Sequence, residues 1–488
     1  MIPSNESEAS GRERWESLRV VIIVAAPFVL AFLVYRDLLG LWFWTDDFVW
    51  LEAASNPDLT DSFREAWRLP QGATPYWRPL VDFHFFSMYR IFGLSGAPYH
   101  VVNVALHAAT AGMLGILVVR VTKSWAMAGL GAALFAVSPT YATMVPWASG
   151  ATAIYASLFS VLTVLLFMSW LQAGRGTALL AVATVAYTLA LLSKEEPAVL
   201  PGVLLVFALA LKPPRNWRDA RALAGALVPF IGLSLAYGVL QAVLEFGPDQ
   251  SPGYSIGWHA LKRLIDSMVW LSLPLHLSYA EWVSPARWAA FATFTFIAAI
   301  SAARRQWLLP SLYIATLLML VPASFFTARF AGRWTHLATL PWAVFIAALF
   351  VYASDALSRM SRPLGLACGV AAAAWLLMFL SGRTLAAHAV IPGFSRDYQA
   401  IERALTSGCA ELTAVDTVYI VQLPLRGPSY SVPALIRLYG SPGLLYLLEP
   451  SDLVEASLPE TGGCSLYWTE ADGYQAAPGP PPVDQLIP

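Results

Sequence analysis

Charged residues are scarce in this 488-residue sequence. Asp, Glu, Lys and Arg make up 12% of it, whereas 57% of the residues are hydrophobic. Soluble domains carry roughly 25% charged residues, so the composition excludes an ordinary soluble protein and indicates a membrane protein. The formal net charge of −1 gives no reason to expect nucleic acid as a partner.

Cysteine is also rare. Cys368, Cys409 and Cys464 form no CxxC or Cys/His pattern that would indicate a zinc site. Cys409 and Cys464 both follow the last long apolar segment. An extracytoplasmic location would permit a disulfide between them, and two unpaired thiols are the alternative.

Long apolar runs, in contrast, are abundant. Arg12, Arg14 and Arg19 precede the first run, as they would in a signal peptide. No small-x-small cleavage site follows this run, and the aromatic cluster Trp42-Phe43-Trp44 comes instead. We therefore expect an uncleaved first span with its N-terminus in the cytoplasm.

Eleven segments are long and apolar enough to cross a membrane, for which about 20 residues are needed. They are about 18–40, 99–119, 125–145, 150–171, 176–193, 196–211, 222–243, 286–303, 307–326, 335–353 and 364–381. A further segment at about 263–280 is weaker because it contains Arg263, Asp266 and Pro274. If it crossed, Arg304 and Arg305 would lie outside, whereas they lie in the cytoplasm if it only dips into the outer leaflet. The positive-inside rule therefore favours eleven spans.

This topology divides the chain into three parts. Residues 1–18 form a cytoplasmic tail, 19–381 a transmembrane domain with a first outer loop at about 43–98, and 382–488 an extracytoplasmic domain with a disordered proline-rich tail. We expect an all-α multi-pass protein of the cell membrane with a small C-terminal α/β domain. In that domain, a polar helix is predicted near Tyr398–Leu405 and a short strand at Asp416–Val421.

The first outer loop is too long for a simple connector. Ser62 and Glu65 have the spacing of a capping box, which predicts a helix through Trp67. A second helix is predicted from Pro79 to Gly93, and its many aromatic residues favour the headgroup layer. We expect the loop to rest on the bilayer as a lid.

Asp46 and Asp47 follow the first span directly, within the aromatic stretch Trp44–Trp50. Carboxylates near hydrocarbon are tolerated mainly where they line a wet cavity or meet a partner. The functional interpretation is a general base, since a neighbouring like charge raises the pKa of a carboxyl; we favour Asp47. The alternative is a cap of the following helix. The pair is also a possible site for a divalent cation, although no further ligand spacing supports one.

A polar stripe marks the outer end of the second span. His100, Asn103 and His107 are spaced i, i+3 and i+7, so they share one helical face. Such a face should point into the bundle or into a cavity. Interhelical hydrogen bonding explains His107 best, whereas the roles of His100 and Asn103 stay open.

Lys194, Glu195 and Glu196 lie between two spans. A lysine at this depth can hold a phosphate as a point charge, and Glu195 can hold the lysine in place. Snorkelling explains one lysine at a membrane boundary but not the two acids beside it.

Other cations complete a predicted phosphate site. Arg78 and Arg333 can clamp a phosphate, whereas Lys262 and Arg263 are expected to be ordinary surface charges. The topology places all these residues and the aspartates on the same outer face. The residues therefore suit transfer from a lipid phosphate to an acceptor hydroxyl, without naming the group transferred.

Several short motifs follow one another over roughly residues 40–340. They are Asp46-Asp47, Trp77-Arg78-Pro79-Leu80, Tyr99–His107, Ala133–Pro139, Leu192–Glu195 and Gly332–Leu337. In this order they resemble the GT-C superfamily of polytopic glycosyltransferases, especially its protein O-mannosyltransferase-like branch. The likeness is to the membrane portion of the transmembrane-and-tetratricopeptide O-mannosyltransferases and their bacterial relatives.

The resemblance implies an inverting transfer at the extracytoplasmic face. The donor would be a polyprenyl-phosphate-linked sugar among the membrane lipids, and the acceptor a hydroxyl of a protein, glycan or lipid. One aspartate of the first loop would be the base. Lys194, Arg333 and Arg78 would hold the donor phosphate, with Glu195, His100 and Asn103 in support.

The sequence departs from the family in three places. Gly332 precedes Arg333 where relatives have glutamate, Ser138-Pro139 stands where His-Pro is usual, and tetratricopeptide repeats are absent. Two other interpretations therefore stay open. One is a non-enzymatic subunit of a larger complex that retains the fold. The other is a carrier or flippase for a polyprenyl-linked lipid, which needs the cations but not the aspartate base.

Overall fold

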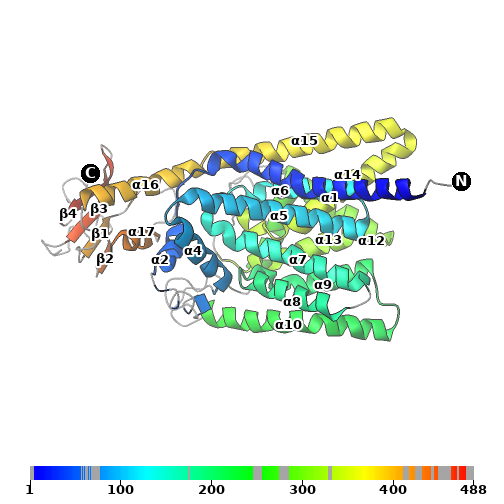
Figure 1. Ribbon diagram of the computed structural model, residues 1–488, viewed down its shortest axis with the longest axis horizontal. Coiled ribbons are helices and arrows are strands. Elements are labelled where there is room, and N and C mark those ends of the chain that lie inside the picture. The colour runs from blue at the N-terminus through cyan, green and yellow to red at the C-terminus, as the bar shows by residue number, and fades with distance from the viewer. Residues whose placement is uncertain are drawn as a thin grey trace.

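The computed structural model describes residues 5–56, 58, 60, 64, 66, 67, 77–173, 176–245, 255, 257–273, 285–327, 332–409, 417–421, 423, 431–440, 444–448, 463–469 and 472–479. The capping-box residues Ser62 and Glu65, the strand residue Asp416 and the tail from 480 onward lie outside this part. Most helices run along the long axis of the molecule, and a small sheet lies at one end (Figure 1).

The helices are numbered in chain order. They are α1 (Asn5–Tyr35), α2 (Asp47–Ala54), α4 (Pro79–Phe92), α5 (Gly96–Thr122), α6 (Trp125–Ala136), α7 (Ala151–Ala173), α8 (Thr177–Leu191), α9 (Leu200–Leu211), α10 (Trp217–Glu245), α11 (Trp258–Ser272), α12 (Pro285–Ala303), α13 (Leu308–Ser324), α14 (Thr339–Met360), α15 (Arg362–His388), α16 (Ile391–Gly408) and α17 (Val432–Tyr439). Short 3₁₀ helices include η2 (Pro139–Tyr141), η3 (Ala148–Gly150), η4 (Glu196–Val199) and η6 (Gly332–Thr335).

Each of the predicted spans contains a helix. In the described part, seven helical segments are long and apolar enough to cross a membrane: 15–38, 96–122, 148–173, 217–241, 285–303, 339–360 and 362–408. The segments 177–191, 196–211 and 308–324 are apolar but shorter. The helix of the weak segment, α11, has 15 residues, fewer than the roughly 20 of a span. The exact number of crossings stays a prediction.

The helix of the third predicted span is much shorter than the span itself. Ser124 caps α6 by accepting a hydrogen bond from the Met127 amide at 3.2 Å, but the helix ends at Ala136. The cause is Pro139, because the residue before a proline is disfavoured in helical conformation and proline lacks the amide hydrogen. The chain continues as η2 and η3, which are buried in the protein.

The helix predicted in the first outer loop is confirmed. Pro79 occupies the first turn of α4, and Gly93 ends it with φ +55°, a conformation that favours glycine. The helix buries Val81 and Phe85 and leaves Phe83 half exposed. It therefore has an apolar face inside the protein and further aromatic surface outside it, as expected of an interfacial helix.

The C-terminal domain is α/β, as predicted. Its sheet has the order β2-β1-β3-β4, formed by β1 (Thr417–Val421), β2 (Leu444–Leu448), β3 (Gly463–Thr469) and β4 (Gly473–Pro478). Strand β1 is parallel to β2 and β3, and β3 is antiparallel to β4. Cys409 at the end of α16 forms a disulfide with Cys464 on β3, so these two thiols are not unpaired.

Two hydrophobic cores organise the molecule. The larger one fills the helical bundle. The second includes Phe48 of α2, Phe85 of α4, Tyr398 of α16 and Ile420 of β1. The first outer loop and the C-terminal domain therefore share one core.

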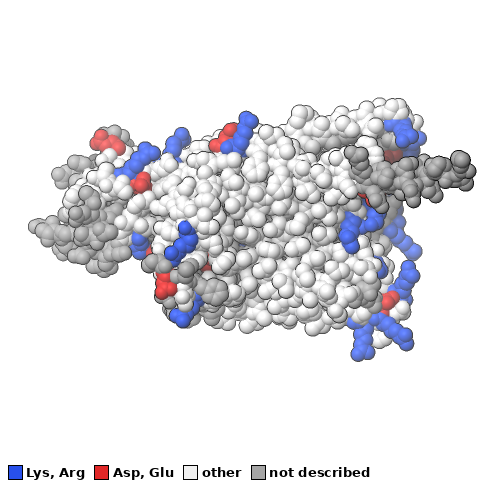
Figure 2. Space-filling view, in the orientation of Figure 1, with Lys and Arg blue, Asp and Glu red and all other residues white. Residues whose placement is uncertain are grey.

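The charge distribution agrees with a membrane-spanning bundle. On the face in Figure 2, a band without charged side chains separates an end rich in Lys and Arg from the end that carries the C-terminal domain. Apolar side chains such as Leu235 of α10 and Val370 of α15 are exposed, as helices facing lipid require.

Candidate active site

A cavity of about 250 Å³ lies where the loop after α1 meets the helical bundle. Side chains from segments far apart in the sequence meet there. The lining consists of Asp46, Trp50, Arg78, Met144, Trp147, Ser149, Thr152, Lys194, Glu195, Phe326, Arg333 and Trp334. Five of the residues selected from the sequence (Asp46, Arg78, Lys194, Glu195 and Arg333) therefore line the same cavity, whereas Asp47, His100 and Asn103 are not among its lining residues.

The two aspartates have different surroundings. Asp47 begins α2 and is fully buried. Its Oδ1 accepts hydrogen bonds from the Ser149 amide at 2.7 Å and the Ser149 hydroxyl at 2.5 Å. Its Oδ2 accepts one from the Trp44 amide at 3.1 Å. Asp47 thus joins the first outer loop to η3.

Burial dominates the acidity of Asp47. It raises the pKa of this carboxyl to about 7, although the hydrogen bonds from Ser149 and Trp44 lower it. The carboxylate is already saturated with donors from the protein. It is therefore poorly placed to accept a proton from a molecule in the cavity.

Asp46 occupies the N-cap position of α2, yet its side chain makes no capping hydrogen bond. The helix-cap interpretation is therefore not supported for this residue. Its carboxylate belongs to the cavity lining, while its main-chain oxygen accepts the Val49 amide at 3.0 Å.

Helix α5 supports both loops that carry these groups. The His100 ring hydrogen-bonds to the Leu41 carbonyl at 3.0 Å and stacks on Trp44 at 5.7 Å between ring centroids. Asn103 donates to the carbonyl of Trp147 at 2.7 Å. His100 and Asn103 therefore hold the backbone of the two loops in place. The third member of the polar stripe, His107, makes the predicted interhelical bond, to the Ala136 carbonyl at 3.1 Å.

The cations are held by ion pairs that differ in part from the expected ones. Arg78 contacts Glu195 at 2.8 Å, and Lys194 contacts Glu196 at 2.7 Å. The Leu80 amide donates to the Leu192 carbonyl at 3.2 Å, which brings the start of α4 against the loop after α8. Arg78 is therefore an ion-pair partner of Glu195, and Glu196 is an ion-pair partner of Lys194.

Glu195 is buried, and burial alone would raise its pKa. The nearby charges of Arg78 and Lys194 outweigh that effect and hold the pKa of Glu195 below its usual value. Glu195 is thus a carboxylate that keeps Arg78 oriented at the cavity wall.

Arg333 extends from η6 and is exposed. Its guanidinium lies over the Trp147 ring at 5.5 Å from the centroid, and no ion pair to it occurs within the described residues. Glycine precedes it for a steric reason. A Cβ at position 332 would lie 2.5 Å from Cζ2 of Trp270, so a glutamate cannot fit there unless Trp270 moves.

Aromatic and hydroxyl groups complete the lining. Trp334 stacks on Phe326 at 4.7 Å with an interplanar angle of 10°. Trp147, Ser149 and Thr152 were missed by sequence reasoning. The signal that could have found Ser149 is a polar residue in a very short outer loop next to a predicted active face.

Residues expected to be ordinary surface charges lie elsewhere. Lys262 pairs with Asp266 at 2.5 Å, and its side chain is 70% exposed. Neither Lys262 nor Arg263 lines the cavity. In the part of the chain that the structure describes, no three His, Cys, Asp or Glu residues are grouped to hold a metal ion.

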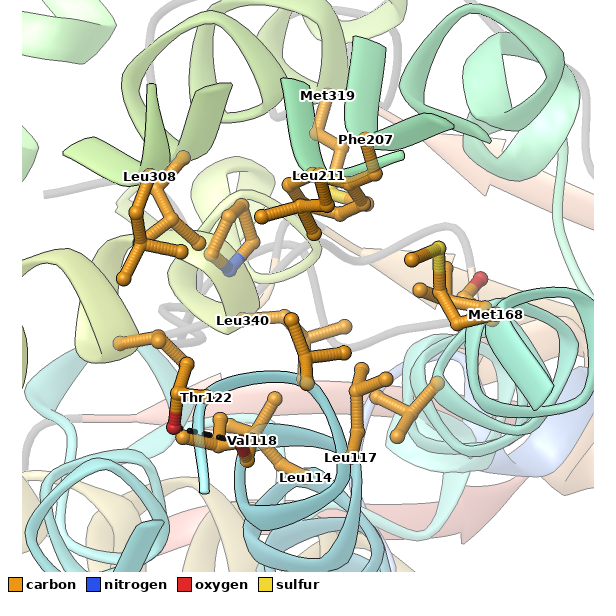
Figure 3. Close-up of a pocket in the computed structure, with 17 residues that line it drawn as sticks. Leu114, Leu117, Val118, Thr122, Met168, Phe207, Leu211, Leu308, Met319 and Leu340 are labelled. Carbon is orange, nitrogen blue, oxygen red and sulfur yellow. Dashed lines mark hydrogen bonds between the residues drawn. The ribbon is translucent and has the colours of Figure 1, made fainter. Parts of the chain in front are cut away.

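A second cavity, of about 60 Å³, lies deeper in the bundle between α5, α7, α9, α13 and α14 (Figure 3). Leu114, Leu211 and Leu308 point into it, and the Thr122 hydroxyl is bonded to the Val118 carbonyl of its own helix at 2.7 Å. Its lining carries no charge, so it offers no group for catalysis or phosphate binding.

No protein-family model and no curated protein sequence matches this chain. Solved structures do match. ArnT from Cupriavidus metallidurans bound to undecaprenyl phosphate has a TM-score of 0.52 and 14% identity, and the match covers 92% of each chain. The AglB oligosaccharyltransferase from Archaeoglobus fulgidus, in complex with an inhibitory peptide and a dolichol-phosphate, has a TM-score of 0.53 and 13% identity.

The fold is GT-C-like. This chain covers 93% of ArnT in another of its structures but only 63% of AglB, so less than two thirds of the archaeal protein has a counterpart here. An oligosaccharyltransferase structure from the same archaeon holds zinc and sulfate (TM-score 0.52, 13% identity). At these identities the likeness is one of fold, and it does not single out the O-mannosyltransferase-like branch.

Proposed function

We propose that this protein is a membrane glycosyltransferase. It transfers a sugar from a polyprenyl-phosphate-linked donor to an acceptor hydroxyl at the extracytoplasmic face. The observation that carries the proposal is the cavity, whose lining brings the carboxylate residue Asp46 together with three cations, Arg78, Lys194 and Arg333. The GT-C-like fold and the neighbours bound to undecaprenyl phosphate or dolichol-phosphate support it.

The charges of the cavity suit a phosphate leaving group. Arg78 and Lys194 are paired with Glu195 and Glu196, whereas Arg333 lines the cavity without an ion pair among the described residues. The charge of Arg333 therefore favours an anion there. Arginine adds paired donors that match phosphate oxygens, and Lys194 adds a point charge.

Asp46 is the proposed base. The acceptor oxygen forms a bond with the anomeric carbon while the bond from this carbon to the phosphate oxygen breaks. The bonding electron pair leaves on the phosphate, which the cations stabilise, and the hydroxyl proton passes to Asp46. The geometry favours Asp46 over Asp47, although the sequence favoured Asp47, because Asp47 is buried and bonded to Ser149.

The experiment is single-turnover transfer by the full-length protein from a panel of polyprenyl-phosphate-linked hexoses, with released polyprenyl phosphate as the readout. Asp46→Asn should slow release roughly 100-fold or more while undecaprenyl phosphate still binds. Asp47→Asn keeps an acceptor for Ser149, so its rate of release should fall less than that of Asp46→Asn. Full transfer by Asp46→Asn would refute the base assignment.

Phosphate binding is tested separately. Arg333→Ala should weaken binding of undecaprenyl phosphate by about tenfold to 100-fold, since a hydrogen bond to a charged group is lost. Arg90→Ala is the matched control, because Arg90 also lies over an aromatic ring, that of Phe86 at 5.2 Å, and does not line the cavity. Equal losses in both variants would contradict the phosphate site.

The rival functions give other results. A carrier or flippase would move the lipid across vesicle membranes and retain this activity in Asp46→Asn. A non-enzymatic subunit would show no turnover with any donor and would be isolated in a stable stoichiometric complex. One observation favours the non-enzymatic subunit: Trp270 leaves no room for a glutamate at position 332.

A further inference from the structure

The residue directly before Asp46 has an unusual backbone. Thr45 has φ +52°, the left-handed region that a β-branched residue rarely adopts. The dihedral angles at this position determine the direction of the chain into Asp46. A strained conformation of this kind persists only where its surroundings fix it.

The transmembrane domain fixes the two ends of this segment. His100 hydrogen-bonds to the Leu41 carbonyl on one side. On the other side, Ser149 donates to Asp47. These contacts leave Trp42, Thr45 and Phe48 to be held from elsewhere.

The C-terminal domain supplies the remaining contacts. The Trp42 amide donates to Ser395 Oγ at 3.0 Å. The Tyr398 hydroxyl forms a hydrogen bond with the Thr45 backbone, and its ring stacks on Phe48 at 5.1 Å. Both Ser395 and Tyr398 are on α16 and are buried.

Helix α16 is itself firmly placed. The Tyr398 hydroxyl also bonds to Ser431 Oγ at 2.7 Å, and Cys409 ties the end of the helix to β3. Further along, Arg437 of α17 forms a bidentate ion pair with Glu52 of α2, with one contact at 3.0 Å. The domain therefore contacts the segment 42–52 at several points.

We propose that the C-terminal domain is a positioning element of the active site, in which Tyr398 and Ser395 hold Thr45 left-handed and thereby direct Asp46 into the cavity. Tyr398 and Ser395 are positioning residues, since they act through the backbone of Trp42–Asp47. This proposal rests on the proposed role of Asp46.

The test measures hydrogen–deuterium exchange of the segment 42–50 in the full-length protein. Tyr398→Phe keeps the ring on Phe48 but removes the hydrogen bonds to Thr45 and Ser431, and Ser395→Ala frees the Trp42 amide. Each should raise exchange in this segment about tenfold. Tyr467→Phe makes the same substitution at a buried position on β3 and should leave the segment unchanged.

Kinetics separates positioning from general structural damage. Tyr398→Phe should lower kcat for sugar transfer about tenfold with unchanged binding of undecaprenyl phosphate, although loss of the bond to Ser431 also lowers Tm. Unchanged exchange, unchanged kcat, or a joint loss of kcat, lipid binding and Tm would each overturn the proposal. Full activity of Asp46→Asn would instead refute the proposed function, whereas an inactive Asp46→Asn beside a fully active Tyr398→Phe would refute only the positioning role.

Discussion

Asp46 and Asp47 are adjacent, yet one faces the cavity and the other faces the protein. The difference comes from the turn at Thr45, which presents Asp47 to the Ser149 amide and hydroxyl. A buried carboxyl with three hydrogen-bond donors fixes structure, whereas a carboxylate on a cavity wall can take up a proton. The same residue type thus serves two purposes in consecutive positions.

The pKa of Asp47, raised to about 7 by burial, predicts a pH dependence of stability. The folded protein binds this proton more tightly than the unfolded chain. The contribution of Asp47 to stability is therefore greatest below about pH 4 and falls as the pH rises to about 7, by up to about 4 kcal/mol. Tm measured between pH 4 and pH 8 should decline more steeply in the wild type than in Asp47→Asn. Identical slopes would show that Asp47 does not titrate in this range.

Sequence reasoning could find the aspartate pair but could not separate its members. The cost of carboxylates beside aromatic residues at a membrane boundary is visible in the residues themselves. Which of the two lines the cavity is not visible in the sequence, and the positive φ of Thr45 directly before them has no signal in a threonine. The ion-pair partners of Lys194 and Arg78 could not be predicted from the sequence either, because they depend on how α4 packs beside the loop after α8.

At the scale of elements, the sequence predicts the ends of a helix where residues at those ends mark them. Pro79 and Gly93 mark both ends of α4, and the structure agrees. Apolar length located α6 but not its end, although Pro139 was in the sequence. A proline ends an α-helix but does not show whether the span continues. Here the chain continues as the buried 3₁₀ helices η2 and η3.

Gly332 of η6 lies against Trp270 of α11, so we predict that position 332 does not tolerate a larger residue. Gly332→Ala places a Cβ 2.5 Å from Trp270 Cζ2, and such overpacking costs about 1–3 kcal/mol. The variant should therefore have a lower Tm. Gly129→Ala on α6 is the control, because its added Cβ meets nothing within 4 Å. Trp270→Leu combined with Gly332→Ala should recover part of the loss; no recovery would mean that another contact is responsible.

For the whole molecule, assembly of the site depends on contacts that no local pattern encodes. The cavity takes residues from the first outer loop, from the loops around η3 and η4, and from η6. The shared core of α2, α4 and α16 adds the C-terminal domain. The resemblance to GT-C proteins predicted the bundle, but it said nothing of this domain, because the family's repeats are absent.

The orientation of the molecule in the membrane stays a prediction, and two features bear on it. Figure 1 shows the N-terminus at one end of the long axis and the C-terminal sheet at the other. Figure 2 shows Lys and Arg at both ends of the long axis, and those at the end opposite the sheet suit cytoplasmic loops. The Cys409–Cys464 disulfide belongs to an oxidising compartment. We therefore expect the C-terminal domain and the cavity to lie outside the cytoplasm.

This orientation predicts the behaviour of topology reporters. Alkaline phosphatase needs an oxidising compartment to form its own disulfides, so it should be active when fused behind the C-terminal domain. The same enzyme inserted between α9 and α10, at Arg215, should be inactive, because that loop carries the positive charges of a cytoplasmic segment. Alkylation of Cys409 and Cys464 in intact cells gives a second measurement, and it should require prior reduction. An active reporter at Arg215 together with an inactive one behind the domain would reverse the orientation and move the cavity to the cytoplasmic face.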